Sequence, residues 1–355
     1  MIFSNFRLLF GLTVSCLILT TPPSVAAPQS KRALPPPTVS LFAHARKIRL
    51  PGIVENYSWK NASELVCFRF RGPQQGRPAQ EGWVVYNLIT KQETPMAVPE
   101  LRSTLGVSPD GQWAVATDPQ ATDVFHWYLM PTFGKMRPFN IPASRFQNGI
   151  DDMALIGDVH PWMADNRHWV IVSDGGHGLL YATIFDRMRP DRWRRVEVKL
   201  PPQEKRIPNV MHRPNAPTYL VGFTPAGAAV VGSGDNNTVD RSVTLYEFAL
   251  NRPQVMAKAR RISLPVPAFP LPMLSPDGKS LVWRVVNKGA AGKRMEIWVS
   301  NRNGAHWRTA GYADPQDGRG DYPSALQWTP DSKHLSVIVG SGLSTPYDMY
   351  IIPAP

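Results

Sequence analysis

Cysteine is nearly absent from this sequence, which contains only Cys16 and Cys67 among its 355 residues. Cys16 lies in an apolar N-terminal segment. Removal of that segment would leave Cys67 alone and would exclude both an intrachain disulfide and a paired-cysteine zinc site. Cys67 stands in a strand-like run, Leu65-Val66-Cys67-Phe68. We therefore expect a buried and inert thiol.

The linear motifs of several enzyme classes are also missing. The sequence has no Gly-x-Ser-x-Gly elbow, no P-loop, no dinucleotide fingerprint and no His-Glu-x-x-His. A peptidase of the prolyl-oligopeptidase kind is excluded further, because no α/β stretch is left over to carry a catalytic triad. An active site assembled from separate repeats would leave no such motif, so these absences favour a noncatalytic protein without excluding an enzyme.

Long apolar runs are missing beyond the N-terminus, where residues 1–26 have the pattern of a signal peptide. Arg7 is followed by the apolar run 8–19, and Ser24-Val25-Ala26 offers a cleavage site. The apolar run is too short for a membrane span of about 20 residues. Cys16 raises the alternative of a lipoprotein, although Thr13-Val14-Ser15-Cys16 is a poor lipobox. We expect export to the periplasm or the medium, a Pro-rich linker at 27–40, and one domain at 41–355.

Acidic residues are outnumbered by basic ones, which gives a net charge of +12. A basic exported protein suits acidic proteins, anionic glycans or other cell-envelope components. No recognised nucleic-acid-binding module accompanies the charge, so we expect no nucleic-acid partner. The densest basic run surrounds a tryptophan and is a candidate patch for an anionic partner. Its residues are Arg187, Arg189, Arg192, Trp193, Arg194 and Arg195.

Proline and glycine are plentiful and recur in one turn pattern. The clearest copy is Leu274-Ser-Pro-Asp-Gly-Lys279, which reads as the end of a strand, a tight turn and the start of the next strand. Matched positions fall at 110, 165, 226, 277 and 331, which are 51 to 61 residues apart, and a shorter copy begins at Tyr57. A repeat of this length, with room for four strands in each unit, predicts a β-propeller of six units.

The two ends of the chain predict how the ring closes. After the sixth turn only two strands remain, at 334–339 and 347–352, so the last unit lacks its outer strand. At the other end, Arg46-Lys-Ile-Arg-Leu-Pro51 has the pattern that ends outer strands elsewhere, an aliphatic residue followed by proline. The same pattern occurs at 98–99, 141–142, 200–201 and 264–265. We therefore expect this N-terminal strand to complete the last unit.

The repeat resembles that of the TolB-type six-bladed β-propellers. The resemblance rests on the turn at 274–279 with Glu296-Ile-Trp-Val299, and on Trp328-Thr-Pro-Asp-Ser-Lys333 with Asp348-Met-Tyr-Ile351. It implies an all-β fold with four-stranded antiparallel blades over about 41–355. Propellers of this type include periplasmic interaction scaffolds, lids of peptidases, and sugar- or lactone-active enzymes. The chain lacks the N-terminal domain of TolB itself.

Candidate ligand-binding residues lie where we expect loops at the mouth of the channel. The third unit is the richest in carboxylates and imidazoles, which suit a divalent cation or acid–base chemistry. The candidates are Asp158, His160, Asp174, His177, Glu55 and His212. Turn chemistry alone also explains Asp and Gly in such loops. We expect a monomeric binding scaffold for a protein or glycan at this mouth, with no cofactor. The alternative is a glycan- or lactone-acting hydrolase or lyase that uses these groups and a cation.

Overall fold

The computed structural model describes most of the repeat region. The described residues are 37–50, 52–71, 80–96, 103–108, 110–117, 126–131, 139–142, 162–176, 178–201, 217–233, 240–268, 272–289, 292–313, 324–339 and 348–355. All the regular elements in these residues are strands. Across the same ranges, no helix is long and apolar enough to cross a membrane.

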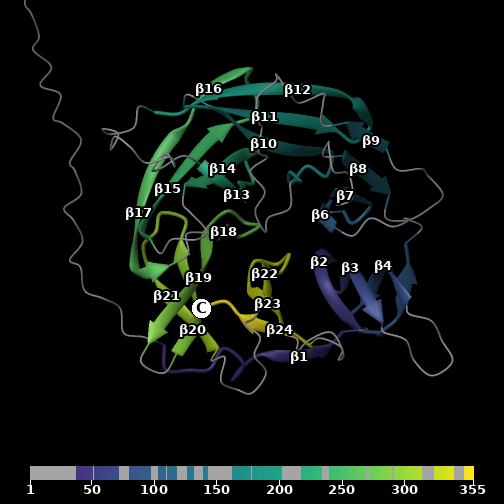
Figure 1. Ribbon diagram of the computed structural model, residues 1–355, viewed down its shortest axis with the longest axis vertical. Coiled ribbons are helices and arrows are strands. Elements are labelled where there is room, and N and C mark those ends of the chain that lie inside the picture. Colours follow the sequence, from purple (N-terminus) through teal and green to yellow (C-terminus); the bar gives the residue numbers. More distant parts are fainter. Residues whose placement is uncertain are drawn as a thin grey trace, which may run out of the picture. The chain divides into compact units, whose positions relative to one another are not determined.

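The described strands form six four-stranded sheets that follow one another along the chain (Figure 1). We number the sheets in that order. Sheets 1 and 2 contain β2 (Ile53–Asn61), β3 (Glu64–Arg71), β4 (Gln80–Asn87) and β5 (Glu93–Pro95), and then β6 (Ser103–Val107), β7 (Trp113–Thr117), β8 (His126–Pro131) and β9 (Phe139–Pro142). Sheet 3 contains β10 (His168–Gly176), β11 (Leu179–Asp186), β12 (Arg189–Lys199) and β16 (Gln254–Met256).

The second half of the chain repeats the arrangement. Sheet 4 contains β13 (Pro217–Phe223), β14 (Ala228–Ser233), β15 (Asp240–Ala249) and β17 (Lys258–Ala268). Sheet 5 contains β18 (Met273–Leu274), β19 (Ser280–Gly289), β20 (Gly292–Asn301) and β21 (Arg308–Ala313). Sheet 6 contains β22 (Ser324–Trp328), β23 (His334–Val339), β24 (Asp348–Pro353) and β1 (Arg46–Arg49). The all-β propeller expected from the repeat is confirmed.

Each hydrophobic cluster joins two consecutive sheets. Val66 and Trp83 of sheet 1 pack with Val107 of sheet 2, and further clusters join sheets 2 and 3, 3 and 4, 4 and 5, and 5 and 6. The sixth cluster joins Ile338 and Met349 of sheet 6 to the strands of sheet 1. The apolar core is therefore a circle of contacts between sheets, and it has no beginning or end.

The N-terminal strand β1 completes the last sheet, as its sequence predicts. It pairs antiparallel with β24, with Ile48 opposite Met349. Ile48 and Leu50 are buried in the cluster that joins sheets 6 and 1. The buried carboxylate of Asp348 lies 2.8 Å from Lys47 Nζ and 3.3 Å from Arg49 Nη1. Hydrogen bonds, apolar burial and charge thus all hold β1 in sheet 6.

A buried polar network makes a second connection between sheets 6 and 1. The hydroxyl of Tyr57, in β2, donates to the carbonyl of Ala325 at 2.8 Å and lies 2.8 Å from Ser336 Oγ. The indole of Trp59 donates to the same Ser336 Oγ at 2.9 Å. Gln327 Nε2 donates to the Tyr57 carbonyl at 2.7 Å. These bonds fix the inner strands of the two sheets to each other.

The recurrent turn is a structural element built the same way in several sheets. In sheet 5, Ser275 Oγ donates to Asp277 Oδ1 at 2.6 Å and accepts from the Ser280 amide. Ser108 with Asp110 and Thr329 with Asp331 repeat the side-chain bond at the same distance. Gly278 has φ of +71°, a conformation that favours glycine, and a Cβ there would lie 2.6 Å from Pro225 of the neighbouring turn. Neighbouring turns therefore pack on one another.

Sheet 3 differs from the sequence expectation at its outer edge. Leu200-Pro201 ends β12, as the pattern predicts, but β12 is not the outermost strand there. The strand β16 runs parallel to β12 beside Glu197–Lys199. It comes from the connection between β15 and β17 of sheet 4, so sheet 4 supplies a strand to its neighbour. The repeat pattern contains no signal for this, because a strand of three residues with only Val255 partly buried is too short to show a periodicity.

Replacing Ile48 tests whether β1 belongs to the core. We expect Ile48→Ala to lower the free energy of unfolding by about 2–5 kcal/mol, the usual cost of emptying a buried aliphatic site. Chemical denaturation measures this change. The matched control is Arg46→Ala in the same strand, where the side chain is exposed and the change should stay within about 0.5 kcal/mol. Equal effects of the two variants would show that β1 is not part of the core.

Candidate functional site

Most of the candidate residues at the channel mouth lie outside the described residues. Asp158, His160, His177 and His212 are in this group. A metal or acid–base site made from them stays a prediction. Among the described residues, no group of three or more His, Cys, Asp or Glu side chains is placed to hold a metal ion.

The backbones of Glu55 and Asp174 are described, and both lie at irregular positions of their strands. The pairing of β2 with β3 shifts between Val54 and Asn56, which leaves Glu55 as an extra residue. The pairing of β10 with β11 shifts between Asp174 and Gly176. Bulges of this kind are frequent beside functional sites because they redirect a side chain. The two predicted positions thus share a local geometry, although they belong to different sheets.

Two described histidines, His168 and His334, form side-chain contacts within the recurrent turns. His168 Nδ1 lies 2.6 Å from Asp165 Oδ2, and His334 Nδ1 lies 3.3 Å from Asp331 Oδ2. Burial alone would raise the pKa of Asp165, but hydrogen bonds from the His168 side chain and backbone hold that pKa below its usual value. Each pair lies within a single turn, so it stabilises the turn and assembles no site with a neighbouring sheet.

The basic run of the sequence forms the first two thirds of β12. The guanidinium of Arg195 lies over the ring of Tyr181 at 4.9 Å and 5.7 Å from the ring of Trp193. Trp193 is 38 % exposed. Cation–π contacts of this kind hold a guanidinium in place beside the aromatic rings. Arg195 and Trp193 therefore form an ordered unit with an exposed aromatic ring.

The other arginines of the run divide into two kinds. Arg194 donates to the carbonyl of Leu250 in the next sheet at 2.5 Å. Arg189 and Arg192 are exposed and have no ion-pair partner among the described residues. We call Arg189, Arg192, Trp193, Arg194 and Arg195 the basic strand patch. Since β16 pairs with β12 only from Glu197 onward, no described strand pairs with the outer edge of β12 at this patch.

Arg187 belongs to the scaffold and not to the patch. Its Nη1 lies 2.5 Å from Asp110 Oδ2, in the turn of sheet 2. Partial burial alone would raise the pKa of Asp110, but hydrogen bonds from Ser108 and Arg187 hold that pKa below its usual value. From the sequence we grouped Arg187 with the other arginines of the candidate patch. In the structure Arg187 instead forms an ion pair with Asp110, which connects sheets 2 and 3.

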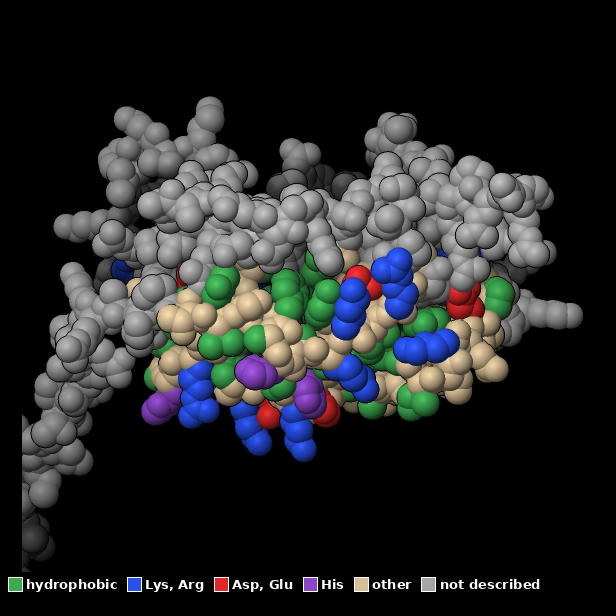
Figure 2. Space-filling model, turned by 90° about the horizontal axis from the view of Figure 1, so that it is seen from below, with side chains coloured by type: hydrophobic (Ala, Val, Ile, Leu, Met, Phe, Trp, Pro, Cys, Tyr) green, Lys and Arg blue, Asp and Glu red, His purple; other side chains and the backbone are tan. Residues whose placement is uncertain are grey.

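Elsewhere on the surface, basic side chains are mixed with acidic ones. On the edge seen in Figure 2, blue Lys and Arg side chains are spaced apart, and red carboxylates lie beside several of them. Lys279 lies 3.8 Å from Asp277, and Lys47 lies 2.8 Å from Asp348. The basic strand patch carries a larger excess of positive charge than this mixed surface, although the exposed Asp191 lies next to Arg192 in the same strand.

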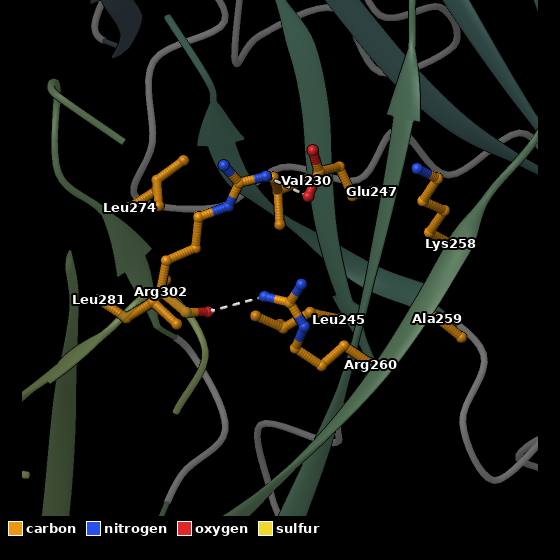
Figure 3. Close-up of a pocket in the computed structure, with 9 residues that line it drawn as sticks. All are labelled: Val230, Leu245, Glu247, Lys258, Ala259, Arg260, Leu274, Leu281 and Arg302. Atoms are coloured by element: carbon orange, nitrogen blue, oxygen red, sulfur yellow. Dashed lines mark hydrogen bonds and ion pairs between the residues drawn. The ribbon is translucent and has the colours of Figure 1, made fainter. Parts of the chain in front are cut away.

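A small cavity of about 60 Å³ lies between sheets 4 and 5 (Figure 3). Its floor is apolar and comes from Val230, Leu245, Leu274 and Leu281. Its rim carries Glu247, Lys258, Arg260 and Arg302. The cavity could not be predicted from the sequence, because its charged residues come from three separate segments: β15, β17 and the turn after β20. One feature of the sequence relates to the cavity: Lys258 and Arg260 are two residues apart in β17, so their side chains leave the strand on the same face.

The comparisons with known proteins show similarity at the level of structure alone. No family model matches the sequence, and no curated protein matches it. A TolB candidate from Agrobacterium tumefaciens is similar with a TM-score of 0.48 and 12% identity, over 88% of this chain and 99% of that one. The β-propeller domain of the trilobed protease from Pyrococcus furiosus has a TM-score of 0.44 and 11% identity, over 89% and 84%.

An oligogalacturonate lyase in complex with manganese has a TM-score of 0.44 and 11% identity, over 88% of this chain and 98% of that one. The chain thus has a structural resemblance to TolB-like β-propellers at low sequence identity.

Labelling of Cys67 tests whether its thiol is accessible and reactive in the folded protein. The side chain is fully buried between sheets 6 and 1, and burial raises the pKa of its thiol to about 12. Only the thiolate reacts with disulfide reagents. We therefore expect no reaction of Cys67 with Ellman's reagent at pH 8 in the native protein, and complete reaction after unfolding in guanidinium chloride. Rapid labelling of the native protein would show that this seam opens.

The ion pair between Asp110 and Arg187 predicts a dependence of stability on pH. A carboxylate with a lowered pKa stabilises the fold above about pH 4, and this stabilisation is lost as the pH falls through the folded-state pKa. We expect Asp110→Asn to lower the free energy of unfolding by about 1 kcal/mol at pH 7 and by less at pH 3. Urea denaturation at both pH values measures the difference.

The matched control for this test is Asp277→Asn. Asp277 makes the same turn bond but has no ion pair with another sheet. Its replacement should cost less than that of Asp110 at pH 7. Equal losses for the two variants, or an Asp110→Asn loss that grows toward pH 3, would contradict the assigned ion pair.

Proposed function

We propose that this protein is an exported, noncatalytic binding scaffold built on a six-bladed propeller, and that it engages an anionic partner through the basic strand patch. The observation that carries the proposal is the ordered unit of Arg195 and Trp193. Arg195 is held by two aromatic rings, and Trp193 keeps more than a third of its surface exposed. Exposed tryptophan and arginine are the residue types that dominate binding surfaces.

The chemistry of the patch favours an acidic glycan as the partner. Arginine guanidinium groups bind carboxylates and sulfates through paired N–H donors. An exposed indole offers an apolar face to a sugar ring. The patch presents arginines at several positions along one strand, on both of its faces. Several separated charges suit a polymer with repeated negative charges better than a single small anion.

A protective role for these arginines accounts for only part of the arrangement. Charged side chains on an uncovered strand edge discourage pairing with other chains, and Arg189 and Arg192 serve that role. Protection does not require an exposed tryptophan, which would itself promote association. The combination of Trp193 with an ordered Arg195 therefore favours binding.

The test uses a sulfated polysaccharide, heparin, as the polyanion. We expect Arg189→Ala/Arg192→Ala to weaken binding at least about tenfold at low salt, since two charge-assisted contacts are lost. Trp193→Ala should weaken it by a smaller factor. Binding to an immobilised polyanion, measured at several salt concentrations, gives both the affinity and its salt dependence.

The matched control removes the same charge from another surface. Lys279 and Lys333 are exposed in the turns of sheets 5 and 6, and Lys279→Ala/Lys333→Ala should bind as well as the unmodified protein. Equal weakening by the two double variants would show attraction by net charge alone. Binding that does not change with salt would also contradict the proposal.

A further inference from the structure

The cavity between sheets 4 and 5 has the composition of a ligand site, and it is separate from the basic strand patch. Three cationic side chains and one carboxylate surround it: Lys258, Arg260, Arg302 and Glu247. Glu247 pairs with Arg302. The charge of the remaining two cations is not balanced by any described carboxylate in the cavity. Both side chains are exposed, so their positive charge attracts an anion to the apolar floor, and salt screens this attraction.

The donors of Arg260 are only partly used. Its Nη1 donates to Asn303 Oδ1 at 2.5 Å and reaches the carbonyl of Arg302 at 3.4 Å. A guanidinium has five N–H donors, and no described residue accepts from the others. In Figure 3 the guanidinium group of Arg302 lies beside Glu247 and Val230, and that of Arg260 lies beside Leu245.

The walls of the cavity are fixed before any ligand binds. The turn that carries Arg302 packs against sheet 4, since a Cβ on Gly304 would lie 2.4 Å from Ile262. The Arg302 amide also donates to the Lys279 carbonyl at 2.7 Å. Preformed walls reduce the ordering cost of binding, so the site needs no rearrangement of the backbone.

The size of the cavity limits the ligand. A cavity of roughly 150 Å³ holds benzene, so the 60 Å³ here suits a carboxylate with a short hydrocarbon part and excludes a sugar ring. The floor residues Leu245, Leu274 and Leu281 are buried and apolar. They offer contact to a methyl or methylene group and no hydrogen bond. We propose that this cavity binds a short-chain carboxylate, with its charged group at Arg260 and its hydrocarbon part on the leucine floor.

Calorimetric titration of the full chain with sodium acetate and sodium propionate, at low salt, tests the site. Propionate should bind about fourfold more tightly than acetate, the gain for one buried methylene. Arg260→Ala should weaken propionate binding at least about tenfold. Glu247→Gln should tighten it, because a competing negative charge is removed. A purely structural role for these residues predicts no gain of affinity in that variant.

Arg261→Ala is the matched control. Arg261 is adjacent in β17 but its side chain points to the other face of the strand, where it donates to Ser242 Oγ at 3.1 Å. It should leave propionate binding unchanged. The proposal is overturned if propionate does not bind, if it binds no better than acetate, or if Arg260→Ala and Arg261→Ala weaken binding equally. Heparin binding through the basic strand patch should be unaffected by Glu247→Gln, so the two sites can fail independently.

Discussion

Every sheet of this protein has two apolar faces, and neither face can be buried within the sheet itself. A four-stranded sheet is stable only if neighbours cover it. Each hydrophobic cluster is shared by two consecutive sheets, and the sixth joins the last sheet to the first. The ring is therefore a requirement of burial. If one seam opened, Val54 and Leu65 on one side and Ile338 on the other would be exposed to water.

The need to bury both faces of every sheet distinguishes the residues that build the ring from those that could bind a ligand. Residues of the recurrent turn, such as Asp277 and Gly278, build turns and contacts between neighbouring sheets, although the fourth copy has Ala226 at the Asp position and the sixth has Ser332 at the Gly position. The features that could bind ligands lie where the repeats differ. The basic strand patch lies on the part of β12 that does not pair with the added strand β16. The cavity lies where the turn carrying Arg302 leans on sheet 4.

Much of the fold could be predicted from the sequence, because the turn pattern recurs and each copy predicts the next strand. The closing strand at Arg46–Arg49 was predictable from the same pattern. The strand β16 was not, since three residues carry too little pattern to predict pairing with Glu197–Lys199, which lie 57 residues earlier in the sequence. The hydrogen bond between Tyr57 and Ser336, which connects sheets 1 and 6, could not be predicted from the sequence either. The patch was visible as a dense basic run, whereas the cavity was not, because sheet packing brings Glu247, Arg260 and Arg302 together.

Crosslinking of the ring closure tests the central claim most directly. Lys47 and Tyr350 are paired positions of β1 and β24, and directly opposite Cα atoms in an antiparallel pair lie about 4.5–5.5 Å apart, within reach of a disulfide. Lys47→Cys/Tyr350→Cys should form an intramolecular disulfide on mild oxidation, and the buried Cys67 should not interfere. The out-of-register pair Ala45→Cys/Tyr350→Cys should form little. Absence of the first disulfide, or equal yields from both pairs, would contradict a ring closed by β1.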